Sequence, residues 1–137
     1  MVIKKILIIS WLCATMSLQG TIHGEISPEV DLSDEIVQAF VYGEANGIGK
    51  HFNSSVELIF NESQGVYGKS QGEQILKTFF ANNASAQGKF TYKHLHGSNR
   101  DNVHYYIGEL HTGKGLYRVT IYMKDKLIHR MRIESND

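Results

Sequence analysis

The chain beyond Gly88 constrains the fold most, because four long segments of alternating side chains follow one another there. They are Lys89–His96, Val103–Thr112, Leu116–Lys124 and Leu127–Glu134. The connections between them are Gly97–Asn102, Gly113–Lys114 and Asp125–Lys126. Alternation of apolar and polar residues predicts half-buried strands, and the last two connections are short enough for hairpin turns. We therefore predict an antiparallel meander for this part of the chain.

The chain before Gly88 shows helical spacing instead. One apolar stripe is formed by Ile36, Val37, Phe40 and Val41, and a second by Ile75, Leu76, Phe79 and Phe80. Ser27-Pro28-Glu29 predicts the start of the first helix, and Ser70-Gln71-Gly72-Glu73 has the form of a capping box for the second. Between them we expect a short helix over Asn46–Phe52 and short strands over Val56–Phe60 and Gly65–Tyr67. Helices followed by a meander predict an α+β domain with its helices on one face of the sheet.

This order of elements resembles the nuclear-transport-factor-2-like superfamily, which has a cystatin-like fold. Three segments further resemble a family of small secreted bacterial proteins known only as a domain of unknown function: Lys50–Leu58, Gly65–Phe80 and Gly115–Val119. The resemblance covers about Glu25 to Glu134. It implies a cone-shaped fold, in which a curved antiparallel sheet wraps N-terminal helices and often leaves a pocket at the wide end. It supplies no activity and no site residue.

The first twenty residues have the order of a secretory signal peptide. Lys4 and Lys5 precede an apolar run over Ile6–Leu18, and a small residue, Gly20, follows. The run is about 13 residues long, shorter than the ~20 that a membrane-spanning helix needs. We therefore predict a signal peptide over residues 1–20 and a single domain over residues 21–137. The domain is expected to be exported to the periplasm or outside a bacterial cell, with no membrane insertion after signal removal.

The charge and the histidines of the chain exclude some classes of partner. The chain has 14 basic and 14 acidic residues and no basic stripe, so we expect no nucleic acid partner. The histidines lie mostly next to predicted strand ends, and the one cysteine, Cys13, lies inside the predicted signal. A zinc site normally needs three or four convergent ligands. We expect no metal and no cofactor.

Alternation selects the residues that would face the helices and line a pocket. On that side it places Tyr92 and His94, Tyr117, and His129. Tyr92, His94 and His129 are also the natural acid–base candidates if the cone is an active site. The alternative is that they are amphipathic residues near strand ends whose polar tips reach water.

The opposite alternation places aromatic and aliphatic side chains on the outer face of the sheet. They are Tyr105, Ile107, Thr120 and Tyr122. An apolar patch of this kind marks an interface, and members of the resembled superfamily often pair through this face. We therefore predict a homodimer centred on these residues, the alternative being a tolerated surface cluster.

No catalytic set can be assembled from the sequence, which leaves three functions open. The favoured one is a non-enzymatic exported domain that binds a small molecule, peptide or protein in its cone or on its sheet face. The second is a cone-pocket enzyme of the isomerase, dehydratase or hydrolase type. The third is a structural interaction module without a pocket.

Overall fold

The computed structural model describes residues 29–136, so the predicted signal peptide over residues 1–20 lies outside the described residues. The elements follow one another as α1 (Asp34–Val41), α2 (Ala45–Gly49), β1 (Phe52–Phe60), β2 (Ser63–Gly68), α3 (Lys69–Asn83), β3 (Thr91–Arg100), β4 (Val103–Thr112), β5 (Gly115–Lys124) and β6 (Leu127–Ser135). Within the described range, no helix is both long enough and apolar enough to cross a bilayer.

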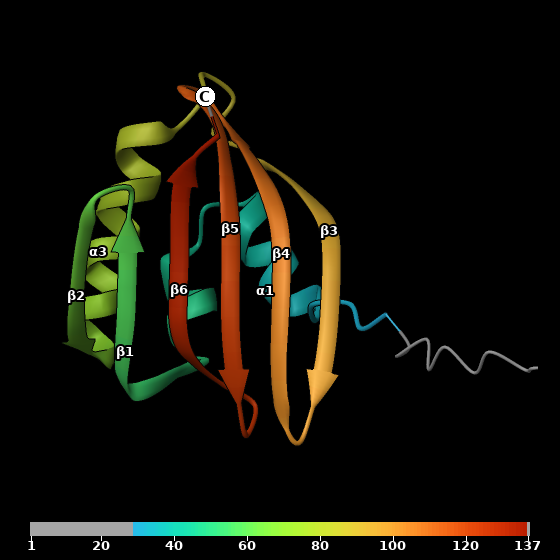
Figure 1. Cartoon of the computed structure of the whole chain (residues 1–137). Helices are drawn as coiled ribbons and strands as arrows, with labels where there is room; N and C mark the ends of the chain where they lie inside the picture. The colour runs from blue at the N-terminus through green and yellow to red at the C-terminus, as the bar shows by residue number, and fades with distance from the viewer. Residues whose placement is uncertain (1–28, 137) are drawn as a thin grey trace, which may run out of the picture.

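The strands form one six-stranded sheet in the order β2-β1-β6-β5-β4-β3. Strands β3 to β6 are the predicted antiparallel meander. The sheet as a whole is mixed rather than antiparallel, because β1 runs parallel to β6. The sheet is curved and the helices cover one of its faces (Figure 1). We call the face toward the helices the inner face and the opposite one the outer face; the predicted α+β architecture is confirmed.

Helix α1 buries Ile36 and Phe40 of the predicted stripe, whereas Val37 and Val41 are only partly buried, and the helix begins later than predicted. Ile36, Ala39 and Phe40 are buried, whereas the helix starts at Asp34 rather than near Ser27 and Pro28. The described residues before it pack against β3 instead, where a Cβ atom at Gly97 would collide with the carbonyl oxygen of Val30. The close approach of this segment to the sheet therefore delays the helix.

Helix α3 also differs from its prediction at the N-terminus. It begins at Lys69 with Gly68 as its N-cap, and no side chain makes a cap hydrogen bond. The predicted capping box of Ser70 and Glu73 is therefore wrong. The helix follows β2 directly, so Ser70 already lies inside its first turn. The buried stripe, Leu76 and Phe80, agrees with the prediction.

Strands β4 and β5 keep the predicted alternation throughout. On β4, Tyr106 and Leu110 are buried, and on β5, Val119, Ile121 and Met123 are buried. Their ladder is regular from Val103↔Lys124 to Thr112↔Gly115. These inner-face residues join the buried helix stripes in one hydrophobic core.

Strands β3 and β6 each contain a bulge that changes the face of the residues beyond it. The β3–β4 register shifts between His94 and His96, and the β5–β6 register shifts between Tyr122 and Met123. A bulge inserts one extra residue into one strand, so simple alternation fails on its far side. On β6 the extra residue is His129, and the buried residue before it is Ile128 rather than Leu127.

Candidate functional site

The structure separates the predicted pocket residues instead of bringing them together. Tyr92, His94 and Tyr117 belong to the inner side of the sheet, where Tyr92 and Tyr117 pack against the core. His129 lies on the outer face with its ring 6.2 Å from that of Tyr122. The predicted convergence of Tyr92, His94 and His129 is therefore wrong, because the bulge in β6 turns His129 away from the helices.

Tyr92 is packed as a core residue. Its ring stacks on Phe40 with 5.3 Å between centroids, and it covers Gly108 so closely that a Cβ there would collide with its hydroxyl. The hydroxyl is buried without a hydrogen-bond partner among the described residues. Burial raises the pKa of Tyr92 to about 12, so the phenol stays neutral at ordinary pH.

Tyr117 ties β5 to the end of α3. Its hydroxyl donates to Oδ1 of Asn83 at 3.0 Å, and Nδ2 of Asn83 donates to the carbonyl oxygen of Phe79 at 2.8 Å. The ring also meets Phe79 edge-on at 5.2 Å. The ring and the hydroxyl of Tyr117 therefore both serve packing, and the hydroxyl is occupied by its hydrogen bond to Asn83.

His94 lies beneath the segment that leads into α1. Its Nε2 is 3.6 Å from Oε1 of Glu29 and 3.5 Å from Oδ1 of Asp31. Both ring nitrogens are shielded from solvent and have no aligned hydrogen bond. When protonated, His94 would attract both carboxylates and hold this segment against β3.

A different set of side chains surrounds the most apolar hollow at the open end of the core. We call it the mouth pocket; it has a volume of about 360 Å³ and is lined by Ser33, Glu35, Ile36, His51, His104, Tyr106, Met123 and Lys126. These side chains come from the N-cap and first turn of α1, the residue that leads into β1, the first part of β4, the end of β5 and the β5–β6 turn. Its floor is apolar and its rim carries the polar groups.

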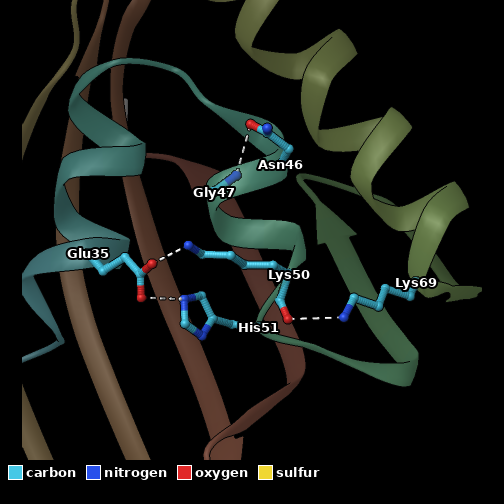
Figure 2. A network of polar contacts seen from close by, with 6 residues as sticks. All are labelled: Glu35, Asn46, Gly47, Lys50, His51 and Lys69. Atoms are coloured by element: carbon cyan, nitrogen blue, oxygen red, sulfur yellow. Dashed lines mark hydrogen bonds and ion pairs between the residues drawn. The ribbon is translucent and has the colours of Figure 1, made fainter.

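One wall of the mouth pocket is a charged network, shown in Figure 2. The carboxylate of Glu35 accepts a hydrogen bond from Nζ of Lys50, and Nε2 of His51 lies 3.2 Å from Oε2 of Glu35. Lys69 supports the network from α3 by donating to the carbonyl oxygen of Lys50 at 3.0 Å. The hydrogen bond from Lys50, with a smaller contribution from His51, lowers the pKa of Glu35. Nε2 of His51 is buried and makes no aligned hydrogen bond among the described residues, so Lys50 occupies the Glu35 carboxylate and His51 only lies beside it.

The opposite wall comes from β4. The rings of His104 and Tyr106 are parallel to within 9° with centroids 6.0 Å apart, and the Tyr106 hydroxyl lies 3.4 Å from Nδ1 of His104. Burial raises the pKa of Tyr106. Both residues lie at the same side of β4, because they are two positions apart on a regular strand.

The mouth pocket is chemically suited to a ligand whose hydrogen-bond acceptor group lies above the apolar floor. Lys126, His51 and His104 can donate to a ligand, whereas the only carboxylate of the lining, Glu35, is already bound by Lys50. His51, whose Nε2 lies 3.2 Å from Oε2 of Glu35, is also a candidate general base by residue type and position. Across residues 29–136, no three or more His, Cys, Asp and Glu side chains cluster in a way that could hold a metal ion.

Sequence reasoning missed Glu35 and His51 as site residues and did not single out His104 and Tyr106 as a pair. Alternation along β4 does place Tyr106 inward, and the same rule extends to His104. For Glu35 and His51 the sequence contains no signal, because they meet only when α1 packs beside the end of α2. Their pairing is a tertiary contact across sixteen positions of chain.

The four predicted outer-face residues do lie together on the outer face. Tyr105, Ile107, Thr120 and Tyr122 occupy neighbouring pairs on β4 and β5, and the rings of Tyr105 and Tyr122 are 5.1 Å apart. Tyr105 is 41% exposed. Their placement agrees with the prediction, while the homodimer itself stays a prediction.

Comparison with known proteins identifies relatives of this chain. The family model described as Domain of unknown function (DUF4783) matches residues 33–135. A DUF4783 family protein from Bacteroides ovatus is 25% identical, with a TM-score of 0.69 over 77% of this chain and 96% of that one. One from Bacteroides uniformis is 24% identical, with a TM-score of 0.70 over 78% of this chain and 99% of that one.

A more distant structure shares the fold alone. It is an NTF2-like protein of unknown function from Cytophaga hutchinsonii, 10% identical, with a TM-score of 0.53 over 74% of this chain and 84% of that one. No protein with a curated description matches the chain. The resemblance predicted from the sequence, to the nuclear-transport-factor-2-like superfamily and within it to a family of unknown function, is confirmed.

Proposed function

We propose that this chain, which belongs to the DUF4783 family and has its nuclear-transport-factor-2-like fold, binds a small amphipathic anion in the mouth pocket. The observation that carries the proposal is the combination of an apolar floor with a rim of donors. Ile36, Met123 and Tyr106 form the floor, and Lys126 and the imidazoles of the rim surround it.

The size and polarity of the mouth pocket support this ligand class. Ligand pockets generally occupy ~300–1,000 Å³ and are mainly apolar, with a few polar groups that orient the ligand. The mouth pocket, at about 360 Å³, suits a small molecule with one aromatic or branched aliphatic body. Its anionic group, most simply a carboxylate, would meet Lys126 and His51, since Glu35 is neutralised by Lys50.

Thermal-shift titration of the purified protein with a panel of aromatic and aliphatic carboxylates tests the proposal. A ligand at 100 times its Kd stabilises the folded state by about 2.7 kcal/mol. Lys126→Gln should weaken the binding of a carboxylate hit about tenfold. The matched control is Lys114→Gln, which changes the lysine in the β4–β5 turn and should leave the affinity unchanged.

Two results would contradict the binding proposal. One is a panel that produces no shift in the unmodified protein. The other is a hit that binds equally well to the Lys126→Gln and Lys114→Gln variants, which would place the ligand elsewhere. The first result would favour the interaction module without a ligand.

A second candidate function, acid–base catalysis in the same pocket, is favoured by the contact between Glu35 and His51. An imidazole beside a carboxylate can move a proton to or from a bound ligand, which typically contributes ~10²–10⁴ in rate. His51→Asn should then abolish turnover of a ligand while retaining most of its binding. His111→Asn, on the exposed end of β4, is the control; equal turnover in both variants would exclude this role for His51.

We further propose that the chain acts outside the cytoplasm of a bacterium, because residues 1–20 have the pattern of a signal peptide. Protein isolated from its native host should begin at or near Thr21. Intact mass measurement checks this, and a native protein that retains Met1 would exclude the export proposal.

A further inference from the structure

A second hollow adjoins the mouth pocket at the same end of the sheet. We call it the turn pocket; it has a volume of about 350 Å³ and is lined by Asn102, His104, Asp125 and Lys126. His104 and Lys126 also line the mouth pocket. The two hollows are therefore neighbours, and a small molecule seated beside these two side chains can contact both.

Two hairpin turns form the rim that the hollows share. The β3–β4 turn is Asp101-Asn102 and the β5–β6 turn is Asp125-Lys126, and both lie at the lower end of the sheet in Figure 1. All four residues have positive φ angles, between 50° and 65°, as a two-residue turn of type I′ requires. The backbone N–H of Asp125 donates to the carbonyl oxygen of Asn102 at 3.4 Å. The two turns therefore support each other and present their side chains side by side.

The charges of the two hollows are separated rather than paired. In the mouth pocket, Glu35 is bound by Lys50, while Lys126 has no carboxylate partner among residues 29–136. In the turn pocket, Asp125 is the one carboxylate of the lining, and its side chain makes no ion pair or hydrogen bond with the described part of the chain. The joined site therefore offers an unpaired cation and an unpaired carboxylate at consecutive positions of one turn.

We infer that the ligand of the mouth pocket is an α-amino acid with an apolar side chain. The inference rests on the proposed function, which supplies the carboxylate, and adds an ammonium group to the ligand. The carboxylate lies at Lys126, the ammonium at Asp125, and the side chain enters the mouth pocket over its apolar floor. In an α-amino acid these three groups leave one carbon atom. A ligand with two charges so close together suits a site made by consecutive residues, whose Cα atoms are ~3.8 Å apart.

Other ligand charges leave part of the site unsatisfied. A simple carboxylate would leave Asp125 without a partner and would place two like charges close together. A plain amine would leave Lys126 and the imidazoles of His51 and His104 without an acceptor. A ligand that carries both signs meets every one of these groups.

The exposure of the two charged side chains sets the size of the expected effect. Asp125 and Lys126 are both exposed. Water and salt weaken ion pairs between exposed groups, so we expect the ammonium to improve affinity about fivefold. The apolar side chain, in the partly enclosed mouth pocket, supplies most of the remaining affinity.

Isothermal titration calorimetry with matched probes tests the inference. L-Phenylalanine and hydrocinnamate share the ring, the chain and the carboxylate and differ in the ammonium group; L-leucine and isocaproate form the same pair for a branched aliphatic body. The unmodified protein should bind the amino acid of a pair about fivefold more tightly. Asp125→Asn should remove this preference by weakening the binding of the amino acid alone. Asparagine keeps the size of the side chain and is tolerated at a positive φ, so the turn should be retained.

Asp101→Asn is the matched control. Asp101 holds the same position in the β3–β4 turn as Asp125 in the β5–β6 turn, with a φ of 52° against 50°. Its carboxylate lies 3.8 Å from Nε of Arg100, and Asp101 lines neither hollow. The control should therefore keep the preference of the unmodified protein. Circular dichroism checks that both variants are folded.

The outcomes separate this inference from the proposed function. If hydrocinnamate and isocaproate bind as tightly as their amino acids, the mouth pocket keeps a carboxylate ligand and the amino-acid assignment is wrong. If the preference persists in Asp125→Asn, or is lost equally in Asp101→Asn, Asp125 is not the ammonium site and the inference is wrong. If none of the four probes binds, the proposed function fails together with it.

Discussion

Strands β5 and β6 are neighbours in the sheet and have similar lengths, yet their sequences predict their faces with different success. Along β5, alternation places Val119, Ile121 and Met123 inside without exception. Along β6, alternation predicts Leu127 and His129 inside, whereas the buried residue is Ile128. The difference is one extra residue in β6 at the bulge. A single inserted position therefore decides whether a histidine can belong to the inner pocket or to the outer face.

Deleting one residue from β5 or from β6 should give the largest difference in stability between variants of the two strands. Removing Thr120 from the regular strand β5 shifts its pairing by one position and turns buried residues such as Ile121 and Met123 to the outer face. We expect this variant to be unfolded, because each buried aliphatic side chain contributes ~2–5 kcal/mol. Removing His129 deletes the extra residue of the bulge and leaves Ile128 and Arg130 on the faces that they already occupy.

The His129 deletion should therefore fold and lose less than about 2 kcal/mol of stability, an ordinary effect for a change outside the core. Urea denaturation followed by circular dichroism measures both variants. A His129 deletion as unfolded as the Thr120 deletion would show that the bulge itself is required for folding.

Two adjacent residues of β6 test where the bulge lies. Ile128 is fully buried and Leu127 is 37% exposed. Ile128→Ala should lower the free energy of unfolding by ~2–5 kcal/mol because it leaves a cavity. Leu127→Ala should lower it by less than about 1 kcal/mol, as is usual for a partly exposed side chain. Chemical denaturation of the two variants measures both losses of stability. A larger loss for Leu127→Ala than for Ile128→Ala would mean that β6 follows simple alternation.

Arg130, the residue that follows the bulge, forms an ion pair with Glu57. Disrupting this pair should have the smallest effect on stability. The hydrogen bond from Arg130, supported by Gln64, lowers the pKa of Glu57 in the folded protein. Glu57 therefore contributes stability at pH values above ~4.3, its ordinary pKa, and loses this contribution as the pH falls through the lower folded value. Glu57→Gln should cost at most about 1 kcal/mol at pH 7, since pairs near the surface are weak.

The pH dependence distinguishes an ion pair from a packing effect. The stability difference between the unmodified protein and Glu57→Gln should be constant between pH 5 and 7 and should shrink below pH 4. Denaturation measured over this range checks it. A difference that grows as the pH falls would show that the pKa of Glu57 is raised rather than lowered.

Local spacing predicted most of the fold because it acts within a few residues. Ile36 and Phe40 lie one helical turn apart, and Tyr106, Leu110, Val119 and Ile121 recur at even intervals, so each set reaches one face whatever surrounds it. The same rule places Tyr105 and Tyr122 on the outer face, where the structure has them. The helix starts were less well predicted, since Asp34 and Lys69 begin their helices where neighbouring strands and segments allow it.

The α+β class, the family and the faces of the regular strands β4 and β5 therefore follow from the order of the residues alone. The folded chain is needed to place the bulges at Leu95 and His129, the parallel contact between β1 and β6, and the contact of Glu35 with His51. The physical reason is that a bulge changes the pairing of two strands, and an ion pair joins distant segments, so neither depends on the periodicity of one segment. Within the candidate site, the contact between Glu35 and His51 is of this second kind, whereas the placing of His104 and Tyr106 follows from alternation along β4.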